Sequence, residues 1–237
     1  MANNWFEFKQ FRIVQERSAM KVGTDGVLLG VCIPNGIYTH ILDVGTGTGL
    51  VALMMAQRFA TASIDAIEID KEAAGEAAFN FSESPWENRL NVIHADARKF
   101  TVSKKYNLIV SNPPYFIQSL KNQCRRKSTA RHAETLAIDD LFKLAANLLE
   151  PNGYFVVILP YDLLQPALSK AKQEYLNTHK IISIKPRADK NHKRVIIILS
   201  FLSAETIQHE ELTIESSIRH HYTDQFKSLT NQFYFDN

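Results

Sequence analysis

The sequence has few of the residues that build metal centres, disulfide frameworks or membrane spans. Only two cysteines occur among 237 residues, Cys32 and Cys124, and their separation fits neither a zinc site nor a redox pair. The eight histidines are scattered along the chain, so we predict no metal site. This low cysteine content predicts a reducing, cytoplasmic setting.

Long apolar runs are also missing, because none approaches the roughly 18 residues of a membrane span. Polar residues and an acid occupy residues 1–10, where a signal peptide would need an apolar block. The length suits one domain, and we expect a monomer that is not attached to a membrane. We expect a single domain over 1–237, with an N-terminal segment (1–36), a catalytic core (37–203) and a C-terminal extension (204–237) whose aromatic residues pack back on the core.

Charge of either sign is not in large excess, since the formal net charge is +2, which weakens the case for a nucleic-acid-binding protein. Two stretches nevertheless concentrate positive charge. Residues 121–131 contain five basic residues and no acid, and residues 185–194 contain five against one acid. Such runs are usually solvated loops, and the alternative is contact with RNA phosphates. The candidates for that contact are Lys121, Arg125, Arg126, Lys127, Arg131, His132, Lys193 and Arg194, of which His132 fits a structural role equally well.

Short apolar runs alternate with helical patterns from residue 40 onward. The runs predict seven strands, at residues 40–45, 63–69, 90–94, 106–111, 154–159, 180–185 and 194–201. Helical patterns fall between them, at residues 50–59, 71–81, 138–149 and 163–175. Strands separated by helices predict an α/β fold with a mostly parallel sheet and helices on both faces. No helix fits between the last two strands, so we expect the last strand to be antiparallel.

A glycine-rich turn, Asp43-Val-Gly-Thr-Gly-Thr-Gly49, joins the first predicted strand to the first predicted helix. Its glycines let the backbone approach a ligand closely. Leu50 stands where a dinucleotide fingerprint has its third glycine, and the lysine of a P-loop is missing. A turn preceded by an acid suits a ligand with an ammonium group and no phosphate, such as S-adenosylmethionine. The candidate residues are Asp43, Gly45, Thr46, Gly47 and Gly49, and the alternative for Asp43 is a residue that only orders the turn.

Acids also follow the next two predicted strands. Glu68, with Ile69 beside it, can accept both hydroxyls of a ribose, whereas Asp70 more naturally caps the following helix. Asp96 can accept the amine of an adenine, and the backbone N–H of Ala97 can meet its ring. The alternative for Asp96 is an ordinary loop cap. These positions favour a ligand that contains a nucleoside.

The pattern on which the functional interpretation depends most is Asn112-Pro-Pro-Tyr115, directly after the fourth predicted strand. Two consecutive prolines make a stiff turn that cannot continue a strand ladder. The Asn112 amide oxygen and the Pro113 carbonyl can each accept one hydrogen of a planar exocyclic amine, and Tyr115 offers a ring on which a base can stack. Such a turn alone is usually only a turn, and the glycine turn upstream favours the catalytic interpretation.

In this order, the turn at 43–49, Glu68, Asp96 and the motif at 112–115 resemble a class I S-adenosylmethionine-dependent methyltransferase of the amino-methylating group. Most of the chain resembles the bacterial tRNA1(Val) (adenine(37)-N6)-methyltransferase family. The segments that carry this further resemblance are residues 11–15, 19–29, 84–86, 114–116, 119–121 and 130–132.

The resemblance implies a Rossmann-like fold, S-adenosylmethionine as cofactor with S-adenosylhomocysteine as product, and tRNA as partner. The implied reaction is methylation of N6 of an adenine, adenine 37 of a valine tRNA. It also implies that Lys21, Gly23, Thr24 and Asp25 lie against the cofactor. On the residues alone, that stretch is only a glycine-containing turn and a helix start.

Three other functions share parts of the pattern. Methylation of an adenine in ribosomal RNA or DNA uses the same chemistry, but DNA-methylating relatives commonly carry a separate target-recognition region and fewer than 40 residues follow Phe201. A protein glutamine amide presents the same planar NH₂, and the basic stretch argues against it. A protein that binds the cofactor without turnover is the third, and Asn112 and Tyr115 argue against it.

Overall fold

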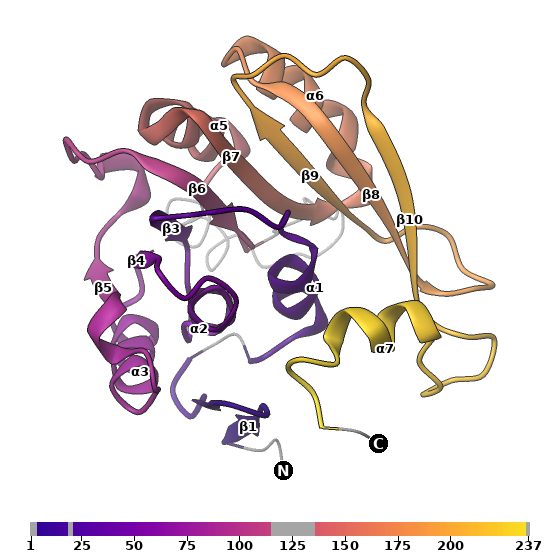
Figure 1. Cartoon of the computed structure of the whole chain (residues 1–237), viewed down its shortest axis with the longest axis horizontal. Helices are drawn as coiled ribbons and strands as arrows, with labels where there is room; N and C mark the ends of the chain where they lie inside the picture. Colours follow the sequence, from indigo (N-terminus) through magenta and orange to yellow (C-terminus); the bar gives the residue numbers. More distant parts are fainter. Residues whose placement is uncertain (1–3, 19–20, 115–135, 236–237) are drawn as a thin grey trace, which may run out of the picture.

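The computed structural model describes residues 4–18, 21–114 and 136–235. A mixed eight-stranded sheet forms its centre, in the order β10-β8-β9-β7-β6-β3-β4-β5 (Figure 1). The strands of this sheet are β3 (His40–Val44), β4 (Ser63–Glu68), β5 (Leu90–His94), β6 (Tyr106–Ser111), β7 (Leu149–Pro160), β8 (Asn177–Arg187), β9 (Arg194–Ser200) and β10 (Gln208–Glu215).

Strands β5, β4, β3, β6 and β7 pair in parallel, as the alternation of strands and helices predicts. In the central strands β3, β6 and β7, successive residues are apolar on both faces because helices cover both sides of the sheet. In β3, for example, the successive residues Ile41 and Leu42 are both fully buried, and so are Leu108 and Ile109 in β6. The strong apolar runs that identified these strands are therefore a consequence of double-sided burial.

In the part of the sheet formed by β7, β9, β8 and β10, one prediction is confirmed and one strand was not predicted. Strand β9 pairs antiparallel with both β7 and β8, as the short connection between β8 and β9 predicts. Strand β10 then adds in parallel to β8 and makes an eighth strand where we predicted seven. Only Leu212 of β10 is buried, while its first four residues are exposed. An edge strand of this kind lacks the apolar pattern that identifies a strand.

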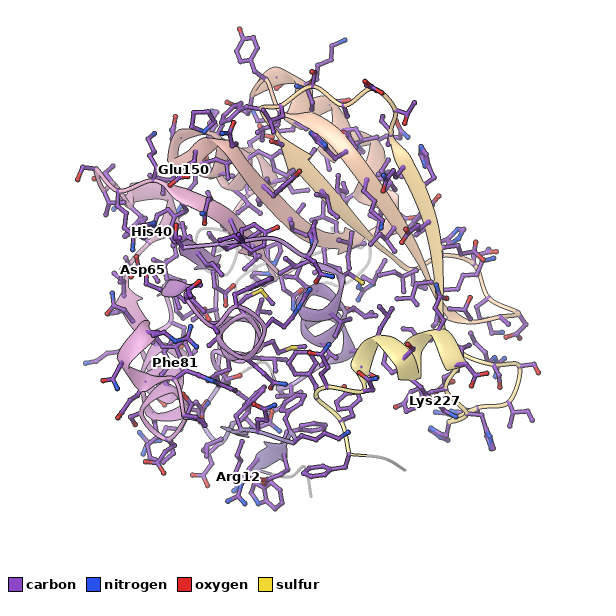
Figure 2. All side chains as sticks on the ribbon, viewed as in Figure 1. Arg12, His40, Asp65, Phe81, Glu150 and Lys227 are labelled. Atoms are coloured by element: carbon purple, nitrogen blue, oxygen red, sulfur yellow. The ribbon has the colours of Figure 1, made fainter. Side chains whose placement is uncertain are left out.

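Helices form a layer on each face of the sheet (Figure 1). Helices α1 (Thr24–Cys32), α2 (Leu50–Arg58) and α3 (Lys71–Ser82) pack on one face, and α5 (Ile138–Leu148) and α6 (Leu164–Gln173) pack on the other. Side chains fill both layers and form two apolar clusters separated by the sheet (Figure 2). The short 3₁₀ turns are η1 (Glu87–Arg89), η2 (Ala97–Lys99) and η3 (Tyr161–Leu163).

The hairpin of β1 (Trp5–Glu7) with β2 (Arg12–Val14) and the C-terminal α7 (Asp224–Thr230) with residues 231–235 meet and form a terminal clasp. Helix α7 lies beside α1, and β2 contacts α3 (Figure 1). Phe8 stacks on Tyr234 with ring centroids 5.7 Å apart, and the backbone N–H of Lys9 donates to the carbonyl of Phe233. Phe233 and Phe226 are each 1% exposed. Phe226, Phe233 and Tyr234 thus pack back on the core, as expected, whereas Tyr222 and Phe235 are exposed.

Candidate active site

The carboxyl ends of four parallel strands bring the predicted site residues to one edge of the sheet. Val44 at the end of β3 lies opposite Ile67 in β4 and opposite Ser111 in β6. Glu68 in turn lies opposite His94, the last residue of β5. After β3 the chain continues to β4 and β5 on one side of β3, and later returns to β6 on the other side of β3. The strand order therefore reverses between β3 and β6. Ligands of open α/β sheets bind in the crevice at such a point.

The glycine turn after β3 has backbone angles that residues with a side chain rarely adopt. Gly45, Gly47 and Gly49 have φ angles of +72°, +58° and +87°, a region in which residues with a Cβ are strained. A Cβ built on Gly45 or Gly47 would meet no atom within 4 Å, so these two glycines border open space. At Gly49 it would lie 2.5 Å from the ring of Phe81, which α3 presents to this turn. Two of the glycines therefore leave room for a ligand, and the third allows close packing.

Asp43 lies beneath this turn and is 1% exposed. Its carboxylate accepts a 2.6 Å hydrogen bond from the Thr46 hydroxyl and another from the backbone N–H of Ala52 in the first turn of α2. Burial raises the pKa of Asp43 to about 7, and the nearby charge of Glu68 adds to the effect, while the two hydrogen bonds oppose it. The described contacts of Asp43 thus order the turn and the helix start, and any influence on a ligand passes through that turn.

Glu68 is held in one orientation by three backbone N–H groups. Its Oε2 atom accepts from Gly47 at 2.8 Å, and its Oε1 atom accepts from Ile69 and Asp70, each at 2.9 Å. A carboxylate has about four acceptor positions, so capacity remains for a ligand hydroxyl. Asp70 caps α3 by accepting from the backbone N–H of Ala73 at 2.8 Å. The acid that faces the glycine turn is therefore Glu68, and half-exposed Ile69 adds an apolar surface beside it.

Asp96 follows β5 at the same edge, but its carboxylate already has partners. It caps η2 by accepting from the backbone N–H of Arg98, and the Arg98 guanidinium binds both carboxylate oxygens at 2.7–3.1 Å. Hydrogen bonds from Arg98 hold the pKa of Asp96 below its usual range. The contacts of Asp96 are thus those of a loop cap. Ala97 is the first residue of η2.

The catalytic candidate Asn112 lies directly after β6 and is half-buried, and Pro113 is buried. The Ser111 hydroxyl donates to the carbonyl of Val44 at 2.8 Å, which fixes the end of β6 to the end of β3. A Cβ built on Gly26 would lie 3.8 Å from Asn112 Nδ2, so the first turn of α1 is close to this amide. The structure therefore brings α1, the glycine turn and Asn112 together.

Several predicted site residues lie outside the described residues, and these are Tyr115, Lys121, Arg125, Arg126, Lys127, Arg131 and His132. The described members of the basic set are Lys193 and Arg194, at the start of β9. Arg194 lies opposite Pro160, the last residue of β7, and the carbonyl of Lys193 accepts from the backbone N–H of Tyr161. Both cations thus lie at the same edge of the sheet as Asn112.

The segment that leads into α1 is anchored by contacts with Gln15 and with β9. The side-chain oxygen of Gln15 accepts from the backbone N–H of Val22 at 2.7 Å. The backbone carbonyl of Gln15 accepts from the Lys21 ammonium. Gly23 is the N-cap of α1, Thr24 its first residue, and Asp25 in the first turn pairs with Arg194 at 2.7 Å. Two residues that we predicted for different ligands therefore bind each other.

Sequence reasoning missed two polar side chains of α3 that fix the N-terminal segment beside the site. Asn80, which is 1% exposed, accepts from the N–H of Val14 and donates to the carbonyls of Val14 and Thr48, at 2.8–3.0 Å. Glu76, one turn earlier, accepts from the backbone N–H groups of Arg17 and Ser18. The available signal was a pair of polar residues four positions apart on the alanine-rich face of a helix.

Within residues 4–18, 21–114 and 136–235, no three His, Cys, Asp or Glu side chains gather in a way that could hold a metal ion. Across the same part of the chain, no helix combines the length and the apolar composition needed to cross a membrane.

Comparisons with known proteins agree with this geometry. The family model described as the methyltransferase small domain matches residues 18–182. A solved structure titled a predicted O-methyltransferase, from Agrobacterium tumefaciens, superposes with a TM-score of 0.69 at 18% identity and covers 90% of this chain and 99% of its own. A glycopeptide N-methyltransferase solved in complex with S-adenosylmethionine superposes with a TM-score of 0.56 at 10% identity, over 80% of this chain and all of its own. At such identities these structures show the fold alone.

Curated relatives are far more similar in sequence. A tRNA1(Val) (adenine(37)-N6)-methyltransferase of Bacteroides fragilis is 43% identical over 99% of both chains. A relative of the same name from Serratia proteamaculans is 40% identical over 97% of this chain and 89% of its own. The fold is that of a Rossmann-like class I methyltransferase, and the chain belongs to the tRNA1(Val) (adenine(37)-N6)-methyltransferase family.

Proposed function

We propose that this protein transfers the methyl group of S-adenosylmethionine to the N6 amine of an adenine in tRNA, namely adenine 37 of a valine tRNA. The observation that carries the proposal is that two turns lie side by side at the carboxyl edge of the sheet, where the strand order reverses, and we place the ligand crevice there. The glycine turn follows β3 and the Asn112 turn follows β6, with Val44 and Ser111 in register and bonded to each other. The names of the relatives support the choice of tRNA and of adenine 37.

The residues of the crevice fit S-adenosylmethionine. Gly45 and Gly47 border open space where backbone can approach a ligand, and the fixed carboxylate of Glu68 is suited to ribose hydroxyls. Ile69 and Ala97 offer apolar contacts for an adenine ring. We propose that residues 21–25, which lead into α1, close the crevice beside Asn112.

The target amine needs activation because its lone pair is delocalised into the adenine ring. If Asn112 Oδ1 and the Pro113 carbonyl each accept one N6 hydrogen, the nitrogen lone pair is directed at the methyl group. Bound S-adenosylmethionine supplies that methyl group in electrophilic form on a sulfonium. The protein then contributes position and matched dipoles, and the proton leaves the nitrogen after transfer without a strong base before attack.

The base must leave its stack to reach a crevice at the edge of a sheet. Stacking on Tyr115 would contribute roughly 1–3 kcal/mol to that capture. Lys193 and the basic stretch at 121–131 would bind the flanking phosphates, and binding should then weaken as salt rises. Action on tRNA also supports a cytoplasmic location.

A labelling experiment tests the proposal. The protein is incubated with methyl-labelled S-adenosylmethionine and an unmodified tRNA1(Val) transcript, and the matched control is the same transcript with guanosine at position 37. We expect label in N6-methyladenosine from the first transcript and none from the control. Equal labelling of both transcripts would contradict adenine 37 as the target. Preferential labelling of ribosomal RNA or of a protein glutamine in parallel incubations would contradict tRNA.

A further inference from the structure

Asp25 and Arg194 form an ion pair between residues 169 positions apart in the sequence. Arg194 Nε donates to Asp25 Oδ2 at 2.7 Å, and the two side chains are 34% and 27% exposed. Asp25 lies in the first turn of α1, and Arg194 is the first residue of β9. The pair therefore joins the first turn of α1 to the sheet itself.

The strand side of this pair is rigid. Arg194 lies in register with Pro160 of β7 and with Ile184 of β8, so two neighbouring strands hold its backbone. The preceding residue, Lys193, donates its N–H to the carbonyl of Ile184 at 2.9 Å and accepts from the N–H of Tyr161 at 3.1 Å. A side chain that projects from such a backbone can fix the position of what it binds.

The helix side of the pair lies next to the catalytic candidate. Gly26 follows Asp25, and a Cβ built on it would lie 2.9 Å from Leu50 Cδ2 and 3.8 Å from Asn112 Nδ2. The first turn of α1 therefore packs closely on the Leu50 side chain at the start of α2, and the Asn112 amide lies near the same turn. A small displacement of this turn would change the surroundings of Asn112, and methyl transfer is sensitive to displacements of this order.

We propose that the Asp25–Arg194 pair is a positioning device that holds the first turn of α1 against the Asn112 turn. Arg194 then acts within the protein, and of the two cations at the start of β9 it is Lys193 that serves RNA. The inference rests on the proposed function, because it takes Asn112 as the group that holds the target amine.

A double-mutant cycle tests the pair with Arg194→Gln, Asp25→Asn and the double variant. For each we measure the S-adenosylmethionine dissociation constant by calorimetry, the single-turnover rate of methyl transfer, and tRNA affinity at two salt concentrations. We expect each single change to lower the transfer rate about five- to twentyfold, and the double change to cost no more than one of them, since residues in contact are coupled. Cofactor affinity should weaken in the same non-additive pattern. Arg194→Lys should restore part of the rate.

Two controls separate this role from charge and from folding. Lys180→Gln removes the ion pair with Glu210 at the opposite edge of the sheet, and it should leave the rate and cofactor affinity unchanged. Lys193→Gln should weaken tRNA binding with a reduced salt dependence while cofactor affinity stays the same. Thermal unfolding of every variant shows whether a lost rate reflects a lost fold.

Independent effects of the two single changes, multiplying in the double variant, would overturn the proposal. It would also fail if Arg194→Gln weakened tRNA binding while Asp25→Asn strengthened it, because Arg194 would then be an RNA contact that Asp25 restrains. If the wild-type protein methylated no tRNA, the proposed function would fail. The S-adenosylmethionine dissociation constants of the two single variants and the double variant would still show whether the pair positions α1.

Discussion

Asp43 is subject to two opposite demands on its charge. Burial favours the protonated carboxyl, whereas the hydrogen bonds from Thr46 and Ala52, and the cationic ligand that we propose above the glycine turn, favour the carboxylate. An acid with a pKa raised on folding adds stability below its unfolded value near 3.8, and it loses that contribution as the pH rises to about 7. The ionised form that suits a cationic ligand is therefore the one that strains the fold.

Asp43→Asn should remove this conflict at the cost of ligand binding. The asparagine cannot ionise, and its single amide oxygen can accept from the backbone N–H of Ala52 while its NH₂ group donates to the Thr46 hydroxyl. We expect the free energy of unfolding at pH 8 to rise by about 1–3 kcal/mol relative to the wild type, and S-adenosylmethionine affinity to fall about tenfold. Urea unfolding between pH 4 and pH 8 gives the first quantity and calorimetry the second. Stability curves that run parallel for variant and wild type would contradict the account.

Asp65 provides a control of opposite sign. Burial alone would raise the pKa of Asp65, but hydrogen bonds from Lys104, Asn91 and Tyr106 hold it below its usual range. Its contribution to stability is therefore present at neutral pH and lost as the pH falls. Asp65→Asn should destabilise the protein at pH 7, and this effect should shrink only as the pH falls below the unfolded value near 3.8, the reverse of the pattern at Asp43.

At Asn112 the expected effect is on transfer rather than on binding. Asn112→Ala removes one of the two proposed acceptors for the amine, and we expect the single-turnover rate to fall at least a hundredfold, the usual cost of one such oriented group. S-adenosylmethionine affinity should change less than threefold, because the cofactor contacts proposed above lie on other strands. A variant that transfers methyl at near wild-type rate would remove Asn112 from the mechanism.

Among the elements, α3 has a larger part in the site than its sequence indicated. Its Asn80 bonds to β2 and to the glycine turn at once, and its Phe81 packs on Gly49. The helix thereby couples the N-terminal segment to the crevice although it contributes no predicted ligand contact. A movement of β2 would be transmitted to the turn through one amide.

Asn80→Ala should uncouple these parts. The change leaves buried backbone groups of Val14 and Thr48 without their partner, so we expect a loss of about 1–3 kcal/mol in the free energy of unfolding. Cofactor affinity should fall severalfold as the turn loosens, and urea unfolding and calorimetry measure the two effects. Asn88→Ala, an exposed amide in η1, is the matched control and should change neither quantity. Unaltered cofactor affinity in a destabilised Asn80→Ala protein would show that α3 only supports the fold.

How far the sequence predicts each element depends on how it is buried. Strands β3, β4, β6, β7, β8 and β9 were predictable because buried apolar residues dominate or centre their runs, and β5 because Leu90, Val92 and Ile93 form a short apolar run although none of them is fully buried. Strand β10 was not predictable, because only Leu212 is buried and its first four residues are polar. The edge location of Glu68 and Asn112 followed from parallel strands alone. The Asp25–Arg194 pair could not follow from the sequence, because no local pattern specifies a contact across 169 positions.

For the whole molecule, the terminal clasp joins the first and last described segments. Rings from both segments stack, and Lys9 bonds to residues 231 and 233 through its ammonium and its backbone. A single domain over 1–237 stays a prediction, and this contact supports it. Val14 at the end of β2 hydrogen-bonds to Asn80, which also bonds to Thr48 in the glycine turn. The clasp is therefore connected to the site through one side chain.

Phe233→Ala tests the clasp. Deleting a ring that is 1% exposed should lower the free energy of unfolding by about 3–5 kcal/mol. Hydrogen exchange should accelerate first in β1 and β2, because these strands lose their cover while the sheet keeps its own. Phe235→Ala, at a ring that is 55% exposed, should have little effect. Equal acceleration across the whole sheet would mean that the clasp is not a separate unit.

The clasp also has a consequence for the order of synthesis. The hairpin emerges from the ribosome before the sheet, and the Tyr234 ring that packs on Phe6 and Phe8 emerges after every strand of the sheet is complete. During translation the early aromatic residues lack their cover, and the segment toward α1 is not yet secured on that side. Until the C-terminal residues are in place, a nascent chain would therefore hold a finished sheet beside an N-terminal segment that is not yet fixed.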